Sequence, residues 1–484
     1  MRAFQRLSAV LVSLALVAAA CGGSGDDGNG DGALAELPEC PVDAHLEADG
    51  TVEVVVWHSY VGLTKQTLEA LAADYNESQD KVEVKIQSQG TSYDELLRKY
   101  EQAIPTDDLP GIAILEDTTA QFMADSGTIL PAQSCLDVDE DERASVDSWL
   151  PVARDYYTID GVLWPVSLNV STIMLYYNRD HFEQAGLDPD DPPQTLDEVR
   201  ETAQALKDAG ASTQPLSFLL QPWFIEYWMT GVGQEVVNGD NGRDELATMG
   251  TLDNEEAQGV YNWINDMTAD GLMAPVSGTP GQINHYLNML GTSSMLFETS
   301  TAITTIIGIL EGSLDPEELG ADLDLSGLPP IDLNISANLF PGIEEPGKGQ
   351  VGGGVWYIPS TNDPEVQAAA WDFAKFINEP ANQVRWTLEG SYLPVNQEAA
   401  ESPELQEAWE TTRGGQWQAI AFEGLLNVDP TFPGPLIGPY DDFREIVRKS
   451  LDDMVLAGTS PEDALSSAND QITEALETYA DENF

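Results

Sequence analysis

The stretch Thr51-Val-Glu-Val-Val-Val56 is rich in β-branched side chains and decides the first step of the fold. It predicts a strand that is buried largely on both faces. Leu68, Leu71, Ala72 and Tyr75 follow it and recur at the spacing of one helix face. The folded part of the chain is therefore expected to begin with a strand and an amphipathic helix.

The same alternation of strand and helix continues along the chain. Residues 82–86 alternate apolar and polar side chains, residues 93–100 open a second helix, and residues 112–115 form another short apolar run. A strand–helix–strand–helix–strand order is typical of a parallel sheet with helical crossovers. We therefore expect an α/β fold.

The pattern changes near residue 160. Residues 167–177 form a strand-like run that is long enough to pass from one domain to another. Thr195 and Glu198 form a capping box at the start of a helix. Further helices are predicted over residues 250–275, over 281–290, from 363 onward and at the C-terminal end, and another strand over 353–358.

Composition limits the classes of function. The chain has 484 residues, of which 42% are hydrophobic, and this length allows two to four globular domains. It carries 83 acidic and 20 basic side chains, a net charge of −63, which argues against electrostatic binding to nucleic acid or to an anionic membrane surface. The four histidines are far apart in sequence, so we expect no histidine-based metal centre and no cofactor.

The N-terminus has the parts of an export signal, which we assign to residues 1–20. Arg2 and Arg6 precede an apolar run over 7–17, and small residues at 18–20 precede Cys21. This arrangement resembles a bacterial lipobox, in which Cys21 would receive lipid; the alternative is an ordinary signal peptide followed by an unmodified cysteine. Residues 21–40 are then a lipidated cysteine with a flexible linker rich in Gly and Asp.

Besides Cys21 the chain has two cysteines, Cys40 at the end of this linker and Cys135. Outside the cytosol they could form a disulfide, and this is the interpretation we favour over two free thiols.

Several short sequences together resemble a known family. The most specific are Tyr176-Tyr-Asn-Arg-Asp180 and Pro192-Pro-Gln-Thr195. The others are Val55-Val-Trp-His-Ser-Tyr60, Tyr75-Asn-Glu-Ser78, Ser92-Tyr-Asp-Glu-Leu96, Gly352-Gly-Gly-Val-Trp356 and Gly390-Ser-Tyr-Leu-Pro-Val395. In this order they resemble the extracellular solute-binding proteins of ABC importers, a family that includes maltose-, multi-sugar- and glycerophosphodiester-binding proteins. The similarity extends over residues 51 to 460.

The resemblance implies a periplasmic-binding-protein-like fold of type II, with two α/β lobes, parallel-rich sheets, hinge strands and a ligand cleft between the lobes. We assign residues 41–166 and 297–358 to the N-terminal lobe, and residues 170–294 and 362–484 to the C-terminal lobe. The resemblance also implies a monomer that is exported, held on the outer face of the cell membrane by its lipid alone, and active with the membrane subunits of an ABC permease. Lobe closure on a ligand is the hinge motion known for such proteins.

Ligands of open parallel sheets bind beyond the carboxyl ends of the strands. Tyr60 follows the first predicted strand and Glu116 follows the third. A carboxylate accepts hydrogen bonds from neighbouring sugar hydroxyls, and an aromatic ring covers the apolar face of a sugar. These two residues are therefore expected to contact a carbohydrate.

The family pattern adds further candidates and also supports Glu116. It implies ligand contacts at Tyr93, Ser171, Ser300, Gly353 and Tyr392, and a stacking platform at Trp223 or Trp228.

One departure from the family bears on the ligand. The glycerophosphodiester-binding branch carries an arginine shortly before its C-terminal helix, whereas residues 432–440 here contain no cation. The nearest, Arg444, is expected on a helix face beside Phe443. Since a buried phosphate would lack a charge partner, we favour a neutral mono- or oligosaccharide over a glycerophosphodiester or glycerol 3-phosphate.

Two other classes of function compete with a transport receptor. A secreted carbohydrate-active enzyme is conceivable because accidental carboxylate pairs are unavoidable among 83 acidic residues. A structural surface lipoprotein is the other. The sequence shows no serine-hydrolase, zinc-protease or P-loop motif, and we expect a binding protein rather than an enzyme.

Overall fold

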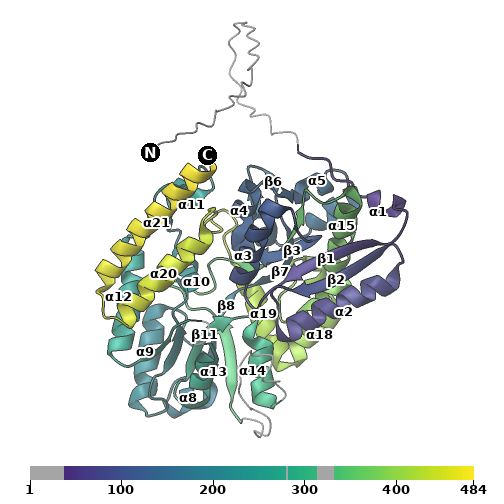
Figure 1. The fold of residues 1–484 in the computed structure, drawn as a ribbon. Coiled ribbons are helices and arrows are strands. Elements are labelled where there is room, and N and C mark those ends of the chain that lie inside the picture. The colour runs from purple at the N-terminus through teal and green to yellow at the C-terminus, as the bar shows by residue number, and fades with distance from the viewer. Residues whose placement is uncertain (1–36, 279–281, 313–331) are drawn as a thin grey trace, which may run out of the picture. The chain divides into compact units, whose positions relative to one another are not determined.

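Two β-sheets organise the chain in the computed structural model, which describes residues 37–278, 282–312 and 332–484 (Figure 1). In the first sheet the strand order is β2-β1-β3-β13-β4, and β7 also pairs with β13. Its strands are β1 (Val52–His58), β2 (Val82–Ser88), β3 (Ile112–Glu116), β4 (Ile129–Leu130), β7 (Val166–Ser171) and β13 (Gly352–Pro359). β1 is parallel to β2 and β3, as predicted, whereas β13 is antiparallel to β3, β4 and β7.

The second sheet has the order β10-β9-β11-β8-β12. Its strands are β8 (Ile173–Asn178), β9 (Leu216–Leu219), β10 (Met273–Val276), β11 (Met295–Thr299) and β12 (Ile335–Leu339). β9 is parallel to β10 and β11, while β8 is antiparallel to β11 and β12. A separate hairpin joins β5 (Thr158–Ile159) to β6 (Val162–Leu163).

The chain passes from the first sheet to the second at a single residue. β7 ends at Ser171 and β8 begins at Ile173, so the run predicted over 167–177 divides at Thr172. Two strands lie in a different sheet from the one expected. β11 and β12 were expected with the first sheet, but they pair with β8 of the second, one on each side and both antiparallel.

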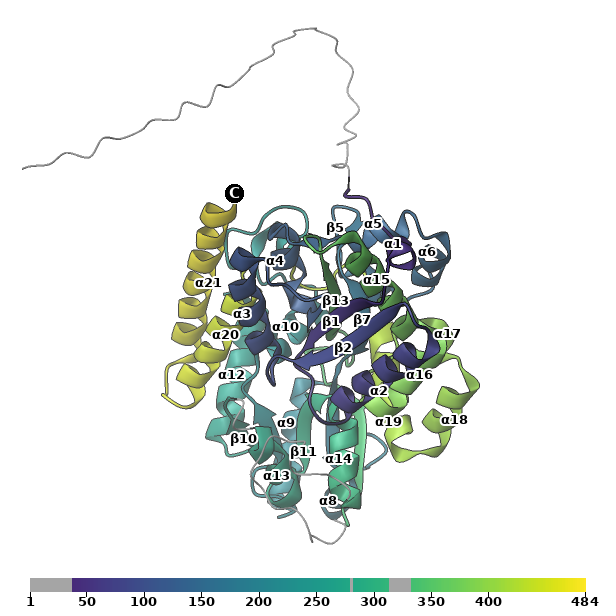
Figure 2. The same cartoon turned by 45° about the vertical axis from the view of Figure 1, so that its right-hand side comes forward.

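Helices cover the first sheet on both faces (Figure 2). α15 packs against β1 and β13, and α16 packs against α2. The residues from 362 to about 400 therefore lie with the first sheet, although they were expected with the second. The helices of this part are α1 (Ala44–Glu47), α2 (Gly62–Ser78), α3 (Tyr93–Ala103), η1 (Ile104–Thr106), η2 (Asp117–Thr119), α4 (Ala120–Asp125), α5 (Ala132–Leu136), α6 (Glu140–Val146), α7 (Pro151–Asp155), α15 (Pro364–Asn378), α16 (Pro380–Gly390), α17 (Gln397–Ala400) and α18 (Pro403–Thr411).

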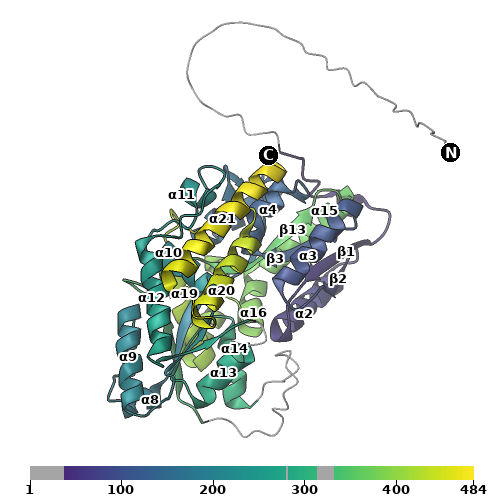
Figure 3. The same cartoon turned by 60° about the vertical axis from the view of Figure 1, so that its left-hand side comes forward.

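Most of the remaining helices lie with the second sheet, and α20 and α21 run side by side against α10 and α12 (Figure 3). α20 contacts α10 and α12, while α19 packs against β12 and α14. These helices are α8 (Arg179–Gln184), α9 (Leu196–Asp208), α10 (Pro222–Gly231), α11 (Asn238–Gly242), α12 (Glu255–Ala269), α13 (Gln282–Gly291), α14 (Ala302–Glu311), α19 (Arg413–Leu426), α20 (Tyr440–Val455) and α21 (Pro461–Asn483).

Strand β8 separates two hydrophobic cores. Met174 and Tyr176 belong to the core that also surrounds the first sheet, whereas Ile173, Leu175 and Tyr177 belong to the core beneath α10, α12 and α20. Successive side chains of a strand point to opposite faces, so the uninterrupted apolar run of β8 reflects burial on both sides.

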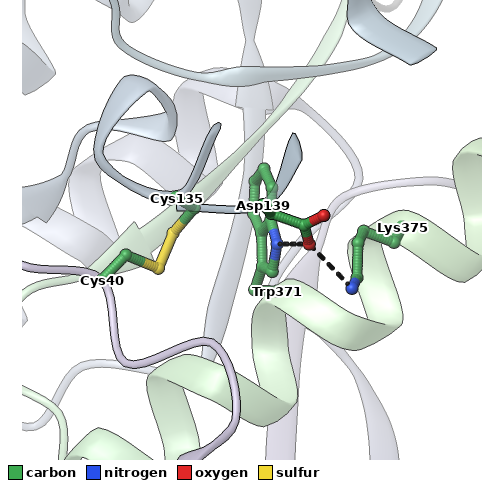
Figure 4. The surroundings of a disulfide bond; sticks show 5 residues. All are labelled: Cys40, Cys135, Asp139, Trp371 and Lys375. Atoms are coloured by element: carbon green, nitrogen blue, oxygen red, sulfur yellow. Dashed lines mark hydrogen bonds and ion pairs between the residues drawn. A yellow bond between two sulfur atoms is a disulfide. The ribbon is translucent and has the colours of Figure 1, made fainter. Parts of the chain in front are cut away.

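A disulfide joins Cys40, before α1, to Cys135 in α5 (Figure 4). Beside it, Asp139 accepts hydrogen bonds from Trp371 Nε1 (3.2 Å) and Lys375 Nζ (3.0 Å) of α15. The disulfide closes a loop of 95 residues, which constrains the unfolded chain by about 4 kcal/mol in the loop-entropy model. It therefore fastens the segment that precedes β1 to helix α5.

The predicted export signal and the lipid-accepting Cys21 lie outside the described residues. Among the helices that the structure does describe, none combines the length and the apolar character needed to span a bilayer.

Candidate functional site

One edge of the first sheet gathers most of the residues singled out by the sequence. β13 runs antiparallel to β3, so the first residues of β13 lie beside the last residue of β3, and Gly354 pairs with Glu116. β7 ends on the other side of β13, where Ser171 pairs with Gly352. This edge holds the carboxyl ends of β1, β3 and β7, the usual place for a ligand in such sheets.

Three tyrosines meet at this edge, and we call Tyr60, Tyr93 and Tyr392 the tyrosine cluster. Tyr60 follows β1, Tyr93 opens α3, and Tyr392 follows α16. The ring of Tyr60 lies 6.0 Å from that of Tyr93 and 5.9 Å from that of Tyr392, and the hydroxyls of Tyr93 and Tyr392 are 3.5 Å apart. Tyr60 is buried, whereas Tyr93 and Tyr392 are partly exposed.

The tyrosine cluster is held against the backbone of β13. Asn169 of β7 donates from Nδ2 to the Tyr60 hydroxyl (3.0 Å) and accepts at Oδ1 from the Gly354 amide (2.9 Å). A Cβ atom on Gly354 would lie 2.3 Å from the Tyr60 hydroxyl and 2.9 Å from that of Tyr93. Glycine at this position is therefore what allows the hydroxyls to approach the strand.

The cluster hydroxyls are neutral over the physiological pH range. Burial raises the pKa of Tyr60 and Tyr93 well above its ordinary value, and burial raises that of Tyr392 to about 12. A neutral hydroxyl both donates and accepts hydrogen bonds, so the cluster can meet another hydroxyl in either role.

A second group, which we call the charge cluster, consists of Glu116, Glu226 and Arg444. Arg444 of α20 binds Glu226 of α10 through Nε and Nη2, both at 2.9 Å, and binds Glu116 through Nη1 at 2.6 Å. The side chain of Glu226 has no exposed area, whereas those of Arg444 and Glu116 are 19% and 26% exposed. The cluster thus connects β3 of the first sheet to two helices of the second.

The two carboxylates keep Arg444 charged. Burial alone would lower the pKa of the guanidinium, but Glu226 and Glu116 together raise it well above its usual value. Tyr440 adds a hydrogen bond from its hydroxyl to Glu226 (3.0 Å), and its ring lies 5.2 Å from the guanidinium carbon. Glu116 pairs with Gly354, and the hydroxyls of Tyr60 and Tyr93 lie against that glycine, so the charge cluster adjoins the tyrosine cluster.

Asp117 follows Glu116 and is buried, with one carboxyl oxygen that has no hydrogen-bond partner in the structure. Burial, and then the neighbouring charge of Glu116, raise the pKa of this carboxyl well above its ordinary value. It is therefore a candidate for a neutral, proton-carrying acid beside the charge cluster.

The two tryptophans proposed as platforms differ. A Cβ on Gly352 would lie 2.6 Å from the Trp223 ring and 3.2 Å from Ser171 Oγ, so Trp223 packs against the start of β13 beside Ser171. Trp228 instead stacks on Phe340 at 5.2 Å and donates from Nε1 to the Pro341 carbonyl. Both tryptophans belong to the second core, but Trp228 lies deeper in it, where its ring also contacts Phe218 of β9 and Phe297 of β11.

Ser300 and Gly353 lie at the crossing between the sheets. Ser300 is fully buried, and its hydroxyl accepts a hydrogen bond from the Thr172 amide (3.2 Å). A Cβ on Gly353 would meet the Asn169 carbonyl at 2.2 Å, so this glycine permits the close approach of β13 to β7. Both residues shape the passage from β7 to β8 in this structure.

The sequence analysis did not single out Asn169 or Glu226, and it placed Arg444 only on a helix face beside Phe443. In the structure Tyr440, Arg444, Val447 and Leu451 lie along the inner face of α20. Helical spacing from Tyr440 was the signal that could have placed it. Glu226 was marked only by being a carboxylate in an otherwise apolar helix, which requires a buried partner.

A surface hollow of about 1020 Å³ lies elsewhere, between α7, α16 and α18. Trp149, Arg154, Val384 and Glu404 are among its lining residues, and none of the predicted site residues lines it.

Comparison with known proteins gives a consistent set of relatives. The family model for "bacterial extracellular solute-binding protein" matches residues 70–413. The sn-glycerol-3-phosphate-binding periplasmic protein UgpB of Salmonella typhimurium is 24% identical over 441 residues, which are 90% of this chain and 94% of the relative. UgpB of Brucella abortus is 25% identical over 435 residues, 87% of this chain and 92% of the relative.

Solved structures share the fold. The cyclic alpha-maltosyl-1,6-maltose binding protein from Arthrobacter globiformis superposes with a TM-score of 0.68 at 21% identity, over 89% of this chain and all of that one. UgpB from Mycobacterium tuberculosis, in complex with glycerophosphocholine, gives 0.69 at 18% identity, also over 89% of this chain and all of that one. The fold is therefore that of type II periplasmic binding proteins, as the sequence predicted.

Proposed function

The chain belongs to the bacterial extracellular solute-binding proteins, and we propose that it captures a neutral carbohydrate for an ABC importer. The observation that carries this proposal is the tyrosine cluster at the carboxyl edge of the first sheet, beside Glu116. It offers neutral hydroxyls, aromatic surface and a carboxylate within one small region.

The chemistry of the tyrosine cluster suits a sugar. The partly exposed rings of Tyr93 and Tyr392 supply flat apolar area at little cost in conformational entropy, and their hydroxyls can bind ring hydroxyls. Trp223 lies at the start of β13 and is the platform we retain from the sequence, together with Ser171, whose hydroxyl is near it. Ligand contacts at Ser300 and Gly353 remain proposals that follow from the family pattern.

We further propose that the two sheets are the centres of two lobes that close on the ligand. Thr172 and residues 340–351 are two of the connections that the motion would bend. Arg444 binds Glu116 of the first sheet and Glu226 of α10. The ion pair between Arg444 and Glu116 joins the two parts and would form as the lobes close.

The proposal includes the setting of the receptor. Cys21 would carry lipid after removal of residues 1–20 and hold the protein on the outer face of the cell membrane. The protein would act as a monomer, hand its ligand unchanged to the permease and catalyse no reaction.

The second candidate ligand is a glycerophosphodiester or glycerol 3-phosphate. Two observations favour it: the relatives that bind such compounds, and the position of Arg444, which binds Glu116 at the edge of the first sheet. Against it stands the pairing of Arg444, because two carboxylates already occupy the guanidinium.

A thermal-shift screen of the purified mature chain separates these possibilities. Mono-, di- and trisaccharides are compared with glycerol 3-phosphate and glycerophosphocholine, and a receptor gains stability as ligand concentration exceeds its Kd. We expect a rise for one or more carbohydrates, no conversion of that carbohydrate on chromatography, and loss of the rise in Glu116→Ala. A rise with the phosphate compounds alone would contradict a carbohydrate ligand, and turnover would support an enzyme.

A further inference from the structure

Glu226 is a carboxylate that the fold has no obvious structural need for. It lies in α10 with no exposed area, among Trp223, Phe224 and Tyr227. A charge in such surroundings is costly unless it is paired and hydrogen-bonded. A hydrophobic residue of similar size would fill the same space without that cost, so the carboxylate invites a functional explanation.

Glu226 contacts Arg444 and Tyr440. Its two oxygens bind Nε and Nη2 of Arg444, and the Tyr440 hydroxyl donates to one of them. Gln350 in turn donates to Tyr440 (2.9 Å). The outer nitrogen, Nη1, is left to face Glu116 at the edge of the tyrosine cluster.

The charge cluster sets one guanidinium, that of Arg444, against two carboxylates. The other guanidinium nearby, Arg243, donates to the carbonyls of Gly434 and Tyr156 and lies over the Tyr156 ring, and its Nη2 has no hydrogen-bond partner. A phosphate ester that enters beside Glu116 would be repelled by the negative charge there, whereas a neutral polyol would not be repelled.

We propose, on the basis of the carbohydrate function proposed above, that Glu226 is a specificity-determining residue. By occupying the guanidinium of Arg444 it excludes phosphate esters from the site and selects a neutral polyhydroxy ligand. The same arginine without this partner would offer its charge to a phosphate. Discrimination between phosphate esters and neutral polyols thus depends on the negative charge of Glu226, which lies behind Arg444.

The test is calorimetric titration of glycerol 3-phosphate into the mature chain and its variants. Glu226→Gln keeps the size and an acceptor oxygen but removes the charge, and we expect it to bind glycerol 3-phosphate at least about tenfold more tightly than wild type. Glu445→Gln, an exposed change of the same charge one residue after Arg444, is the matched control and should match wild type. The gain should vanish in Glu226→Gln/Arg444→Gln and persist in Glu226→Gln/Arg243→Gln.

Three results would overturn the inference. The first is a folded Glu226→Gln variant that binds glycerol 3-phosphate no more tightly than wild type, and the second is a gain in affinity that persists in Glu226→Gln/Arg444→Gln. The third is tight binding of glycerol 3-phosphate by the wild-type chain that Arg444→Gln abolishes. If Glu226→Gln does not fold, Glu226→Asp takes its place, since the shorter side chain cannot keep both bonds to Arg444. A smaller gain than that expected for Gln would then support the inference, and affinity equal to wild type would overturn it. Failure of the proposed function is a separate result, because it would appear as absence of carbohydrate binding by the wild-type chain.

Discussion

The tyrosine cluster and the charge cluster adjoin each other but are built on opposite principles. In the tyrosine cluster the hydroxyls of Tyr93 and Tyr392 meet only loosely, at 3.5 Å, and both side chains are partly exposed. In the charge cluster Arg444 makes three short bonds to carboxylates and is largely covered. The hydroxyls of the first group have hydrogen-bonding capacity to offer a ligand, while the guanidinium of Arg444 is occupied by carboxylates. The difference teaches that proximity to a site does not by itself make a cation a ligand contact.

The strongest way to break this contrast is to remove the cation. Arg444→Met should lower the free energy of unfolding by about 3–5 kcal/mol, because it leaves Glu226 buried without its charge partner. Urea unfolding measures the change. Lys449→Met is the control: its side chain and that of its partner Asp453 are 58% and 45% exposed, and we expect a loss below about 1 kcal/mol. Similar losses in the two variants would show that the charge cluster is not a special unit.

A methyl group at Gly354 attacks the tyrosine cluster instead. Gly354→Ala should cost about 2 kcal/mol of stability by overpacking against Tyr60 and Tyr93, and it should abolish carbohydrate binding by displacing their hydroxyls. Gly259→Ala, in α12 with no atom within 4 Å of the added carbon, should leave both properties unchanged or raise stability slightly. Normal binding by Gly354→Ala would place the ligand elsewhere.

Removal of a single hydroxyl separates binding from stability. Tyr392→Phe should weaken carbohydrate binding by about 1 kcal/mol, roughly fivefold, while stability changes by less than that, since the hydroxyl has only a distant neighbour. Titration calorimetry and urea unfolding on the same preparation give the two numbers. A variant that loses stability but keeps affinity would assign Tyr392 to the core.

The smallest expected effect concerns Asp117. Its pKa is raised in the folded state, so the folded protein binds a proton that the unfolded chain releases, and stability falls as pH rises above the unfolded pKa toward the folded one. Asp117→Asn should remove this fall and stabilise the protein near neutral pH by about 1 kcal/mol or less. Unfolding curves from pH 5 to 8 measure the slope, with exposed Asp108→Asn as the control. An unchanged slope would show that Asp117 is ionised in the folded state.

Local pattern was enough to predict the elements of the first sheet but not how distant segments join. Residues 51–56, 82–86 and 112–115 form parallel strands because alternation and β-branching are properties of short stretches. The placement of β11 and β12 in the second sheet depends on pairing with β8, which no local signal encodes. Trp223 and Trp228 likewise share one helix and one core, and only the packing of α10 decides that Trp223 meets β13 while Trp228 stacks on Phe340.

The site was predicted where strand ends determine it and missed where helices complete it. Glu116 and Tyr60 follow strands directly, so the topology of a parallel sheet places them. Arg444 and Glu226 come from helices whose docking onto the sheet edge is a tertiary event. The cation Arg444 is present near the tyrosine cluster. Its pairing with Glu116 and Glu226 is the feature that argues for a neutral ligand.

The crystal structure of the mature chain with the carbohydrate that gives the largest thermal shift tests the central claim most directly. We predict that sugar hydroxyls lie within hydrogen-bond distance of Tyr93, Tyr392 and Glu116, with Arg444 still bound to Glu226. A sugar seated in the hollow lined by Trp149 and Arg154, with the tyrosine cluster untouched, would contradict the account.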